Sequence, residues 1–425
     1  MVRVTDMTHG RPIRLILLFS LPLMLGSVFQ QLYTIVDTII IGRGVGMQAL
    51  ASIGAADWIN WLVLWGLQGF TQGFAILTAQ EFGAGAYDRL RRVLAMIVKL
   101  SCWFGIAVTI ISLLLVRPLL TLLHTDPAVF GGAQTYLYVQ FGGSLIIIAY
   151  NMAAAVLRCL GDSRTPLFAI IAASFANIAL DLLFVMGFGW GIFGASFATV
   201  LAQLIAFLLC LRSLRRLPFV QLTKADWKTD PAILLHLCRL GIPTGLQMSM
   251  ITLGGMVLQS VLNGFGVVFV AGYTAANKLY GILESASVAF GYAMTAYMGQ
   301  NRGARNAARI DAGIRAVLVL SAEFTAAIVT AMLLAGKPLL GLFLSTEEAG
   351  AADALAVAYQ YLMVLMAFLF ALFVLQAYRS SLQGLGEMTV PTLSGFAEML
   401  MRMGAALVLP VFIGKSGVFF AEGAA

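Results

Sequence analysis

The sequence predicts an all-α protein that crosses a membrane many times, and three observations lead to this fold class. Of its 425 residues, 60% are hydrophobic and only 11% are charged, whereas soluble proteins contain roughly 25% charged residues. The apolar residues form runs long enough to cross a bilayer, which takes roughly 20 residues in a helix. Motifs of the first half also return in the second half, 220 to 225 positions later.

Eleven apolar runs follow one another along the chain, and we expect each to form one membrane-spanning helix. The predicted spans are Leu15–Ile41, Ala49–Ala79, Val93–Val116, Ala133–Leu157, Leu167–Phe188, Ile192–Leu211, Leu237–Leu262, Val267–Met298, Ala312–Ala335, Ala354–Tyr378 and Thr392–Ile413. Gly417–Ala421 matches Gly191–Ala195 at the start of the sixth span. We therefore expect a twelfth span to begin there and to continue past Ala425, so that the chain is truncated.

Basic residues predict the orientation of the spans. Nineteen Lys and Arg residues, Arg158 and Arg379 among them, fall in the N-terminal tail and in alternate loops, and only Arg43, Arg117, Lys337 and Lys415 fall in the opposite loops. Loops rich in Lys and Arg stay in the cytoplasm. We therefore expect a multi-pass protein of the cytoplasmic (inner) membrane with a cytoplasmic N-terminus. The net charge of +7 then reflects orientation and not a nucleic-acid partner.

The internal repeat predicts two similar bundles. Matching pairs are Ser20–Pro22 with Gly241–Pro243, Ala79–Ala84 with Gly299–Ala304, Arg117–Leu120 with Lys337–Leu340, and Leu157–Pro166 with Leu382–Pro391. Such parallel repeats are related by a pseudo-two-fold axis along the membrane normal. We expect an N-terminal lobe of six helices at residues 1–211, a cytoplasmic linker at 212–236 and a C-terminal lobe at 237–425.

Polar residues inside the predicted spans mark a candidate site. A carboxylate such as Asp37 costs about 2.5–3.5 kcal/mol at the centre of a membrane helix, so it needs a partner or a function. Gln30, Tyr33 and Asp37 share one helical face, and Asn177 and Asp181 are four residues apart on another span. Oxygen ligands of this kind suit a small cation, or a proton shared between carboxylates. The alternative is a hydrogen-bonded cluster that only holds helices together.

Several segments resemble one transporter family. They are SLP (Ser20–Pro22), FQQLYTIVDTIIIGRGVG (Phe29–Gly46), LTAQEFGAG (Leu77–Gly85), VLRCLGDSRTP (Val156–Pro166) and NIALDLLFVMGFGWGIFGASFATVLAQ (Asn177–Gln203). Together they resemble the multidrug and toxic compound extrusion (MATE) family in its prokaryotic DinF-like branch. The resemblance covers the whole chain and implies a twelve-helix antiporter that exports organic, often cationic, compounds in exchange for protons or sodium.

The resemblance also implies roles for individual residues. The family's N-terminal cation site corresponds to Asp37, Asn177, Asp181 and Thr199, and its hinge proline in the first helix corresponds to Pro22. The seventh span, Leu237–Leu262, contains no acidic residue, which argues against the C-lobe cation site of another branch. Aromatic and amide groups suit large organic cations, and we expect substrate contacts at Gln30, Tyr33 and Asn151.

Other function classes are weaker. A lipid-linked oligosaccharide flippase shares the two-lobe plan, but such proteins line their cavity with several basic residues, and the spans here contain only Lys99, Lys278 and Arg402. No His, Asp and Glu constellation suggests an enzyme, and the four cysteines lack metal-ligand spacing. We expect no cofactor beyond the coupling ion, no metal beyond sodium at the cation site, and no obligate protein partner. Glu398 and Arg402, four residues apart, predict a structural ion pair.

Overall fold

A computed structural model describes residues 4–344 and 350–425, and within these ranges the chain is helical with no β-strand. The first half contains α1 (Pro12–Gly44), α2 (Met47–Gly83), α3 (Tyr87–Leu122), α4 (Pro127–Gly142), α5 (Ser144–Cys159), α6 (Arg164–Asp181), the π-helix η1 (Leu182–Gly187) and α7 (Gly191–Arg215). The second half contains α8 (Pro231–Asn263), α9 (Val267–Gly303), α10 (Ala307–Gly341), α11 (Ala351–Gly384), α12 (Thr389–Ile413), the 3₁₀ turn η4 (Lys415–Phe419) and α13 (Phe420–Ala424).

Each of the eleven predicted spans corresponds to a helix or to a pair of consecutive helices. Within the described ranges, nine segments are long and apolar enough to cross a membrane, and the bent pair α4 and α5 makes a tenth. The predicted eighth span forms α9, a continuous helix of 37 residues, but it is too polar to pass the same test. Polar residues are tolerated in α9 because it packs against α11, α2, α1 and α10 and so contacts protein along its length. The multi-pass, all-α fold class is confirmed.

The predicted span Ala133–Leu157 is not one straight helix. It breaks at Gly143, and α4 and α5 are bent by 50° relative to each other. Two consecutive glycines, Gly142 and Gly143, weaken the helix at this point. A β-carbon at Gly143 would lie 2.6 Å from a methyl group of Val200 on α7, so the break also lets α7 approach closely.

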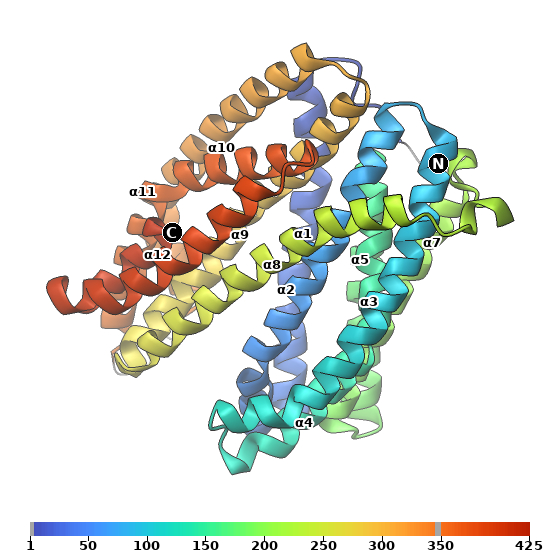
Figure 1. Ribbon diagram of the computed structural model, residues 1–425. Helices are drawn as coiled ribbons and strands as arrows, with labels where there is room; N and C mark the ends of the chain where they lie inside the picture. The colour runs from blue at the N-terminus through green and yellow to red at the C-terminus, as the bar shows by residue number, and fades with distance from the viewer. Residues whose placement is uncertain (1–3, 345–349) are drawn as a thin grey trace.

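The helices form two groups that meet at one end of the molecule. Figure 1 shows α1 to α7 in one group and α8 to α12 in the other, converging near the N-terminus and diverging towards the opposite end. Glycines permit the close approach. A β-carbon at Gly83 of α2 would lie 1.9 Å from the carbonyl oxygen of Gln300, and one at Gly303 of α9 would lie 1.9 Å from that of Gln80. The two positions are equivalent in the internal repeat.

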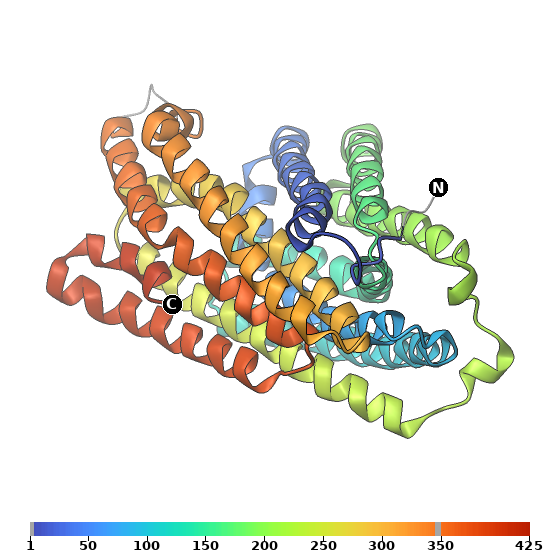
Figure 2. The same ribbon diagram turned by 90° about the horizontal axis from the view of Figure 1, so that it is seen from above.

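The connection between the groups runs along the outside of the molecule (Figure 2). Because α7 extends to Arg215 and α8 begins at Pro231, the ends of the predicted linker 212–236 are helical. Between them lie two short 3₁₀ turns, η2 (Pro218–Val220) and η3 (Lys224–Trp227). Burial alone would raise the pKa of Asp226, but hydrogen bonds from Thr223 and the charge of Arg91 on α3 outweigh it and hold that pKa below its usual value. The linker is thereby attached to α3.

Close packing at Gly313 leads to a stability prediction. A β-carbon at this α10 position would lie 2.3 Å from the ring of Tyr297, which is fully buried on α9. Overpacking a core costs about 1–3 kcal/mol, so Gly313→Ala should lower the thermal midpoint of the purified protein. Gly341→Ala on the same helix meets no atom within 4 Å and should leave the midpoint unchanged. Equal midpoints for the two variants would contradict the packing described here.

Candidate functional site

A small polar cavity lies inside the first group of helices. It measures about 50 Å³ and is lined by side chains of α1, α5, α6 and α7. The lining residues are Gln30, Tyr33, Tyr150, Ile170, Ala173, Ser174, Asn177, Thr199, Ala202, Gln203 and Ala206. Pockets for organic ligands occupy roughly 300–1,000 Å³. In this conformation the cavity has room for a small ion or for water, and not for a larger organic molecule.

Helical periodicity explains why these side chains meet. Gln30, Tyr33 and Asp37 occupy positions i, i+3 and i+7 of α1, and Ser174, Asn177 and Asp181 occupy the same positions of α6. Residues at this spacing share one face of a helix. Because α1 packs against α6, two polar stripes of identical spacing face each other across the cavity.

Two carboxyl groups meet at the end of these stripes. The side chains of Asp37 and Asp181 lie close enough to interact directly. Asp181 is fully buried and Asp37 is half-buried. An ionised carboxylate only accepts hydrogen bonds, so neither group satisfies the other while both are charged. The carboxylate oxygens of Asp181 accept no hydrogen bond in this structure; one between the two groups would require that either of them hold a proton.

Several polar atoms at this point have no hydrogen-bond partner. They are both side-chain polar atoms of Asn177, both carboxylate oxygens of Asp181 and Oδ1 of Asp37. Leaving a buried polar group unsatisfied costs about 1–3 kcal/mol. Because the atoms are mainly oxygens of the kind that hold protons and small hard cations, the residues present fit a proton or a sodium ion.

The structure adds residues that the sequence analysis did not single out. Tyr150, Ser174 and Gln203 line the cavity, and Asp57 on α2 lies near enough to Asp37 to interact with its charge. Helical spacing from Asn177 and Thr199 identifies Ser174 and Gln203. Tyr150 lies on a different helix and is placed only by the packing of α5 against α7.

Asn151 and Pro22, two residues of the predicted site, do not line the cavity. Asn151 is not among the cavity-lining residues, and its amide donates a hydrogen bond of 2.9 Å to the carbonyl oxygen of Ile147 in the same helix. Pro22 lies inside α1, which continues unbroken from Pro12 to Gly44. The substrate contact of Asn151 and the hinge at Pro22 stay predictions.

The backbone changes form directly after Asp181. Here α6 ends and the π-helix η1 begins, and its six residues of wider turns end at Gly187. π-helical turns are rare and occur frequently at functional sites. Within the described ranges, no group of three or more His, Cys, Asp and Glu side chains is arranged to hold a metal ion, so any cation here would be held by two carboxylates with amide and hydroxyl oxygens.

The second group of helices contains a cluster of buried charges that pair with one another. Glu398 accepts hydrogen bonds from Arg379 at 2.8 Å and from Arg402 at 3.1 Å, and Arg402 also contacts Glu422 at 2.9 Å. The predicted pair of Glu398 and Arg402 is confirmed as part of a larger network. Arg379 does not lie in a loop as predicted, because it is buried inside α11 where Glu398 neutralises it.

Arg158 is likewise not a loop residue. It is buried in α5, and its guanidinium group lies 4.6 Å from the ring centre of Tyr292 on α9. This cation–π contact stabilises the charge away from water. Nearby, the amide of Gln68 donates a hydrogen bond of 2.8 Å to the Tyr292 hydroxyl. Tyr292 therefore connects the two groups of helices.

Reciprocal hydrogen bonds close the end at which the groups converge. Gln80 Nε2 donates to the carbonyl oxygen of Gly384 at 3.0 Å, and Gln300 Nε2 donates to that of Cys159 at 3.0 Å. Gln80 and Gln300 are equivalent in the repeat, as are Cys159 and Gly384. Each half thus donates to the other in the manner expected for a pseudo-two-fold relation.

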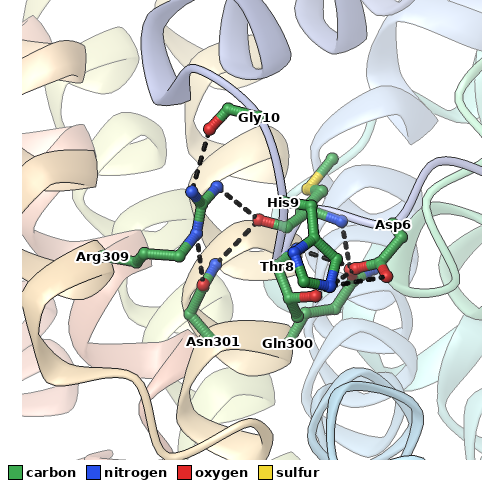
Figure 3. A network of polar contacts seen from close by, with 8 residues as sticks. Asp6, Thr8, His9, Gly10, Gln300, Asn301 and Arg309 are labelled. Carbon is green, nitrogen blue, oxygen red and sulfur yellow. Dashed lines mark hydrogen bonds and ion pairs between the residues drawn. The ribbon is translucent and has the colours of Figure 1, made fainter.

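An N-terminal strap, residues 4–10, reinforces this closure (Figure 3). Thr5 N donates to the carbonyl oxygen of Gly161 at 3.1 Å, and Met7 N donates to Gln300 Oε1 at 2.8 Å. Arg309 at the start of α10 donates to the carbonyl oxygens of Met7 and Gly10 at 2.9 and 2.8 Å. The strap therefore bonds to both groups of helices.

Comparisons with known proteins agree on one family. The family model described as MatE matches residues 22–183 and 243–408. The chain is 33% identical over 368 residues to YpnP of Bacillus subtilis (strain 168), named a probable multidrug resistance protein, which covers 85% of this chain and 80% of that protein. It is 26% identical over 338 residues to NorM of Thermotoga maritima, a protein with the same description, covering 77% and 72% of the two chains.

Solved structures share the fold. A MATE protein crystallised in complex with MaL6 superimposes with a TM-score of 0.91 at 24% identity, covering 100% of this chain and 95% of that one. A MATE multidrug resistance transporter in an outward-facing conformation gives a TM-score of 0.90 at 24% identity, covering 99% and 94% of the two chains. At this identity the likeness establishes the fold.

The network around Glu398 leads to a second stability prediction. Glu398→Gln would leave Arg379 and Arg402 buried without their shared carboxylate, and breaking a buried ion pair costs about 3–5 kcal/mol. We expect a clear fall in the thermal midpoint. Asp353→Asn, a change of the same chemistry at an exposed position at the start of α11 and outside the predicted span, should have little effect. If Glu398→Gln unfolded at the wild-type temperature, the network would not be structural.

Proposed function

The chain belongs to the multidrug and toxic compound extrusion (MATE) family, and from this premise we propose that it exports small organic molecules, often cationic, in exchange for protons or sodium. The observation that supports this most is the meeting of Asp37 and Asp181 beside a polar cavity between membrane helices. Nothing in the lining of that cavity is basic, so a pyrophosphate-linked oligosaccharide is not favoured as substrate.

The carboxyl pair supplies the coupling chemistry. When both groups are ionised, the two carboxylates repel each other and attract a cation. Binding of one proton or one sodium ion relieves this repulsion. Asn177 and Thr199 offer an amide and a hydroxyl oxygen beside the pair as further ligands for sodium. A charge that crosses a membrane potential of 100 mV gains about 2.3 kcal/mol, which is enough to drive export against a gradient.

Competition links the ion to the substrate. A cationic organic molecule and the coupling ion both favour the ionised carboxylates, so binding of one weakens binding of the other. A ligand shifts a conformational equilibrium only through different affinities for the two states. Because the cavity measures about 50 Å³, α1 must move outward, with Pro22 as the hinge, before Gln30 and Tyr33 contact a substrate.

The end that the N-terminal strap closes indicates towards which side of the membrane this conformation is open. If the bias of Lys and Arg places the N-terminus in the cytoplasm, the bonds of Gln80 and Gln300 close the cytoplasmic side, and the diverging ends in Figure 1 face outward. Alternating access then requires both bonds and the strap to release. Because few hydrogen bonds hold this end closed, they can break and form again in each transport cycle.

Removing either carboxylate tests the coupling. Asp37→Asn and Asp181→Asn should each reduce ion-driven export in proteoliposomes by at least about tenfold, because an amide neither binds nor releases a proton. The variants should still insert into the membrane in normal amounts. Asp353→Asn, at an exposed position at the start of α11, should transport at the wild-type rate. Wild-type, ion-dependent export by Asp37→Asn would show that the carboxylates are structural and would refute this mechanism.

The native Cys159 reports on the closed end. Its side chain is 3% exposed and its carbonyl oxygen accepts the Gln300 bond. A hydrogen bond contributes about 0.5–1.5 kcal/mol, so Gln300→Ala should raise Cys159 labelling by roughly two- to tenfold. The reagent is a membrane-impermeant maleimide added to inside-out vesicles, with labelling measured by peptide mass spectrometry.

The matched control is Gln48→Ala, which removes a 2.7 Å bond to Ala128 at the opposite end and should leave Cys159 labelling unchanged. Faster labelling in intact cells than in inside-out vesicles would reverse the orientation. Unchanged labelling in Gln300→Ala would contradict the role of the bond in closure.

A further inference from the structure

A groove separate from the polar cavity lies where α1 and α10 begin. It is an open groove of about 640 Å³ between helices of the two different groups. We call it the α1–α10 groove; its lining residues are Arg11, Pro12, Ile13, Ala308, Asp311, Ala312, Arg315, Ala316 and Val319. Its volume falls within the range of roughly 300–1,000 Å³ that is typical of sites for small organic molecules.

The lining combines two unpaired cations with an apolar floor. Arg11 and Arg315 are exposed, and neither forms an ion pair or a side-chain hydrogen bond with any residue in the described part of the chain. Most other lining side chains are apolar. Asp311 is the one acidic side chain among the lining residues, so the groove carries a net charge of +1. A ligand that matches it has an anionic end and an apolar body.

The position of the groove relative to the bilayer matches a lipid. Arg11 directly precedes α1, and Arg315 lies about two turns into α10. Further into the expected span, Val319 remains 47% exposed, and Ile13 beside Arg11 is 37% exposed. Exposed apolar side chains on membrane helices face acyl chains, and basic side chains at helix ends lie at the level of the headgroups.

The strap fixes the shape of the groove. Arg309 donates a 2.8 Å hydrogen bond to the carbonyl oxygen of Gly10, so the residue before Arg11 is held against the first turn of α10. The first turn of α1 contains no acidic residue, and its N-cap makes no side-chain hydrogen bond. The positive end of the helix therefore adds to the attraction for an anion.

We propose that the α1–α10 groove binds one anionic phospholipid, with its phosphate held by Arg11 and Arg315 and its acyl chains along Ile13, Ala316 and Val319. Basic pockets between membrane helices on the cytoplasmic side are suited to anionic headgroups. The binding itself does not depend on the proposed transport function; only the choice of the cytoplasmic leaflet rests on the proposed orientation. The lipid contacts both groups of helices and so bridges the closed end.

Native mass spectrometry of the purified full chain tests the proposal. The probes are phosphatidylglycerol and phosphatidylcholine with identical acyl chains, and the measurement is the dissociation constant of the first bound lipid. Each arginine near an anionic headgroup contributes about 1 kcal/mol, or about fivefold in affinity. Arg11→Gln with Arg315→Gln should therefore weaken phosphatidylglycerol binding about 25-fold, whereas phosphatidylcholine should bind weakly to both proteins.

Two further variants sharpen the test. Arg43→Gln removes an exposed arginine at the other end of α1 and should leave the affinity unchanged. Asp311→Asn removes the opposing charge and should tighten binding of phosphatidylglycerol about fivefold, which keeps the test informative if the double variant folds poorly. Millimolar inorganic phosphate should fail to displace the lipid, because phosphate lacks the acyl chains that contact the apolar lining.

Several results would overturn the proposal. Equal affinity of wild type and the double arginine variant would show that the groove is not the site. Tighter binding of phosphatidylcholine than of phosphatidylglycerol, lost in Asp311→Asn, would indicate a site for a zwitterionic headgroup whose ammonium group contacts that carboxylate. Displacement by phosphate alone would show a site for a soluble anion. None of these measurements depends on export activity, so failure of the transport mechanism and failure of lipid binding are distinguishable.

Discussion

A charged side chain that has left water must be neutralised, and the two halves of this protein meet that constraint in different ways. In the second half, Glu398 lies between Arg379 and Arg402, and each of these three charges has a partner within 3.1 Å. In the first half, Asp37 and Asp181 face each other with no basic residue among the cavity lining. Only the charges around Glu398 in the second half neutralise one another. The pair in the first half needs an ion or a proton, which is why we locate the coupling chemistry there.

The contrast is sharper because the halves are repeats. At the offset of 225 that relates Leu157–Pro166 to Leu382–Pro391, Asn177 corresponds to Arg402 and Ala173 corresponds to Glu398. These equivalent positions therefore differ: Asn177 of α6 has a side-chain amide without a hydrogen-bond partner, whereas Arg402 of α12 is an ion-paired cation. The two repeats therefore differ at these inward positions: the first carries polar groups without partners and the second carries paired charges.

The same symmetry accounts for closure at one end. Gly83 and Gly303 let the backbones of α2 and α9 approach each other, and Gln80 and Gln300 then reach carbonyl oxygens of the opposite half. Close backbone packing and a few hydrogen bonds thus hold the two halves together at this end. The N-terminal strap, which lies outside the repeat, adds bonds to both halves.

The sequence by itself determined the membrane class, the eleven helical spans, the internal repeat and the polar stripes that contain Asp37, Asn177 and Asp181. These features depend on local periodicity and composition, which are written along each helix. Tertiary structure alone decided that Asp37 meets Asp181, that Tyr150 joins the cavity, that α4 and α5 bend at Gly143 and that Arg158 and Arg379 are buried. It also decided that α9 lies between helices of both groups, where it contacts α11, α2, α1 and α10. Each of these outcomes depends on which faces of distant helices pack together, and side-chain spacing within one helix contains no information about its neighbours.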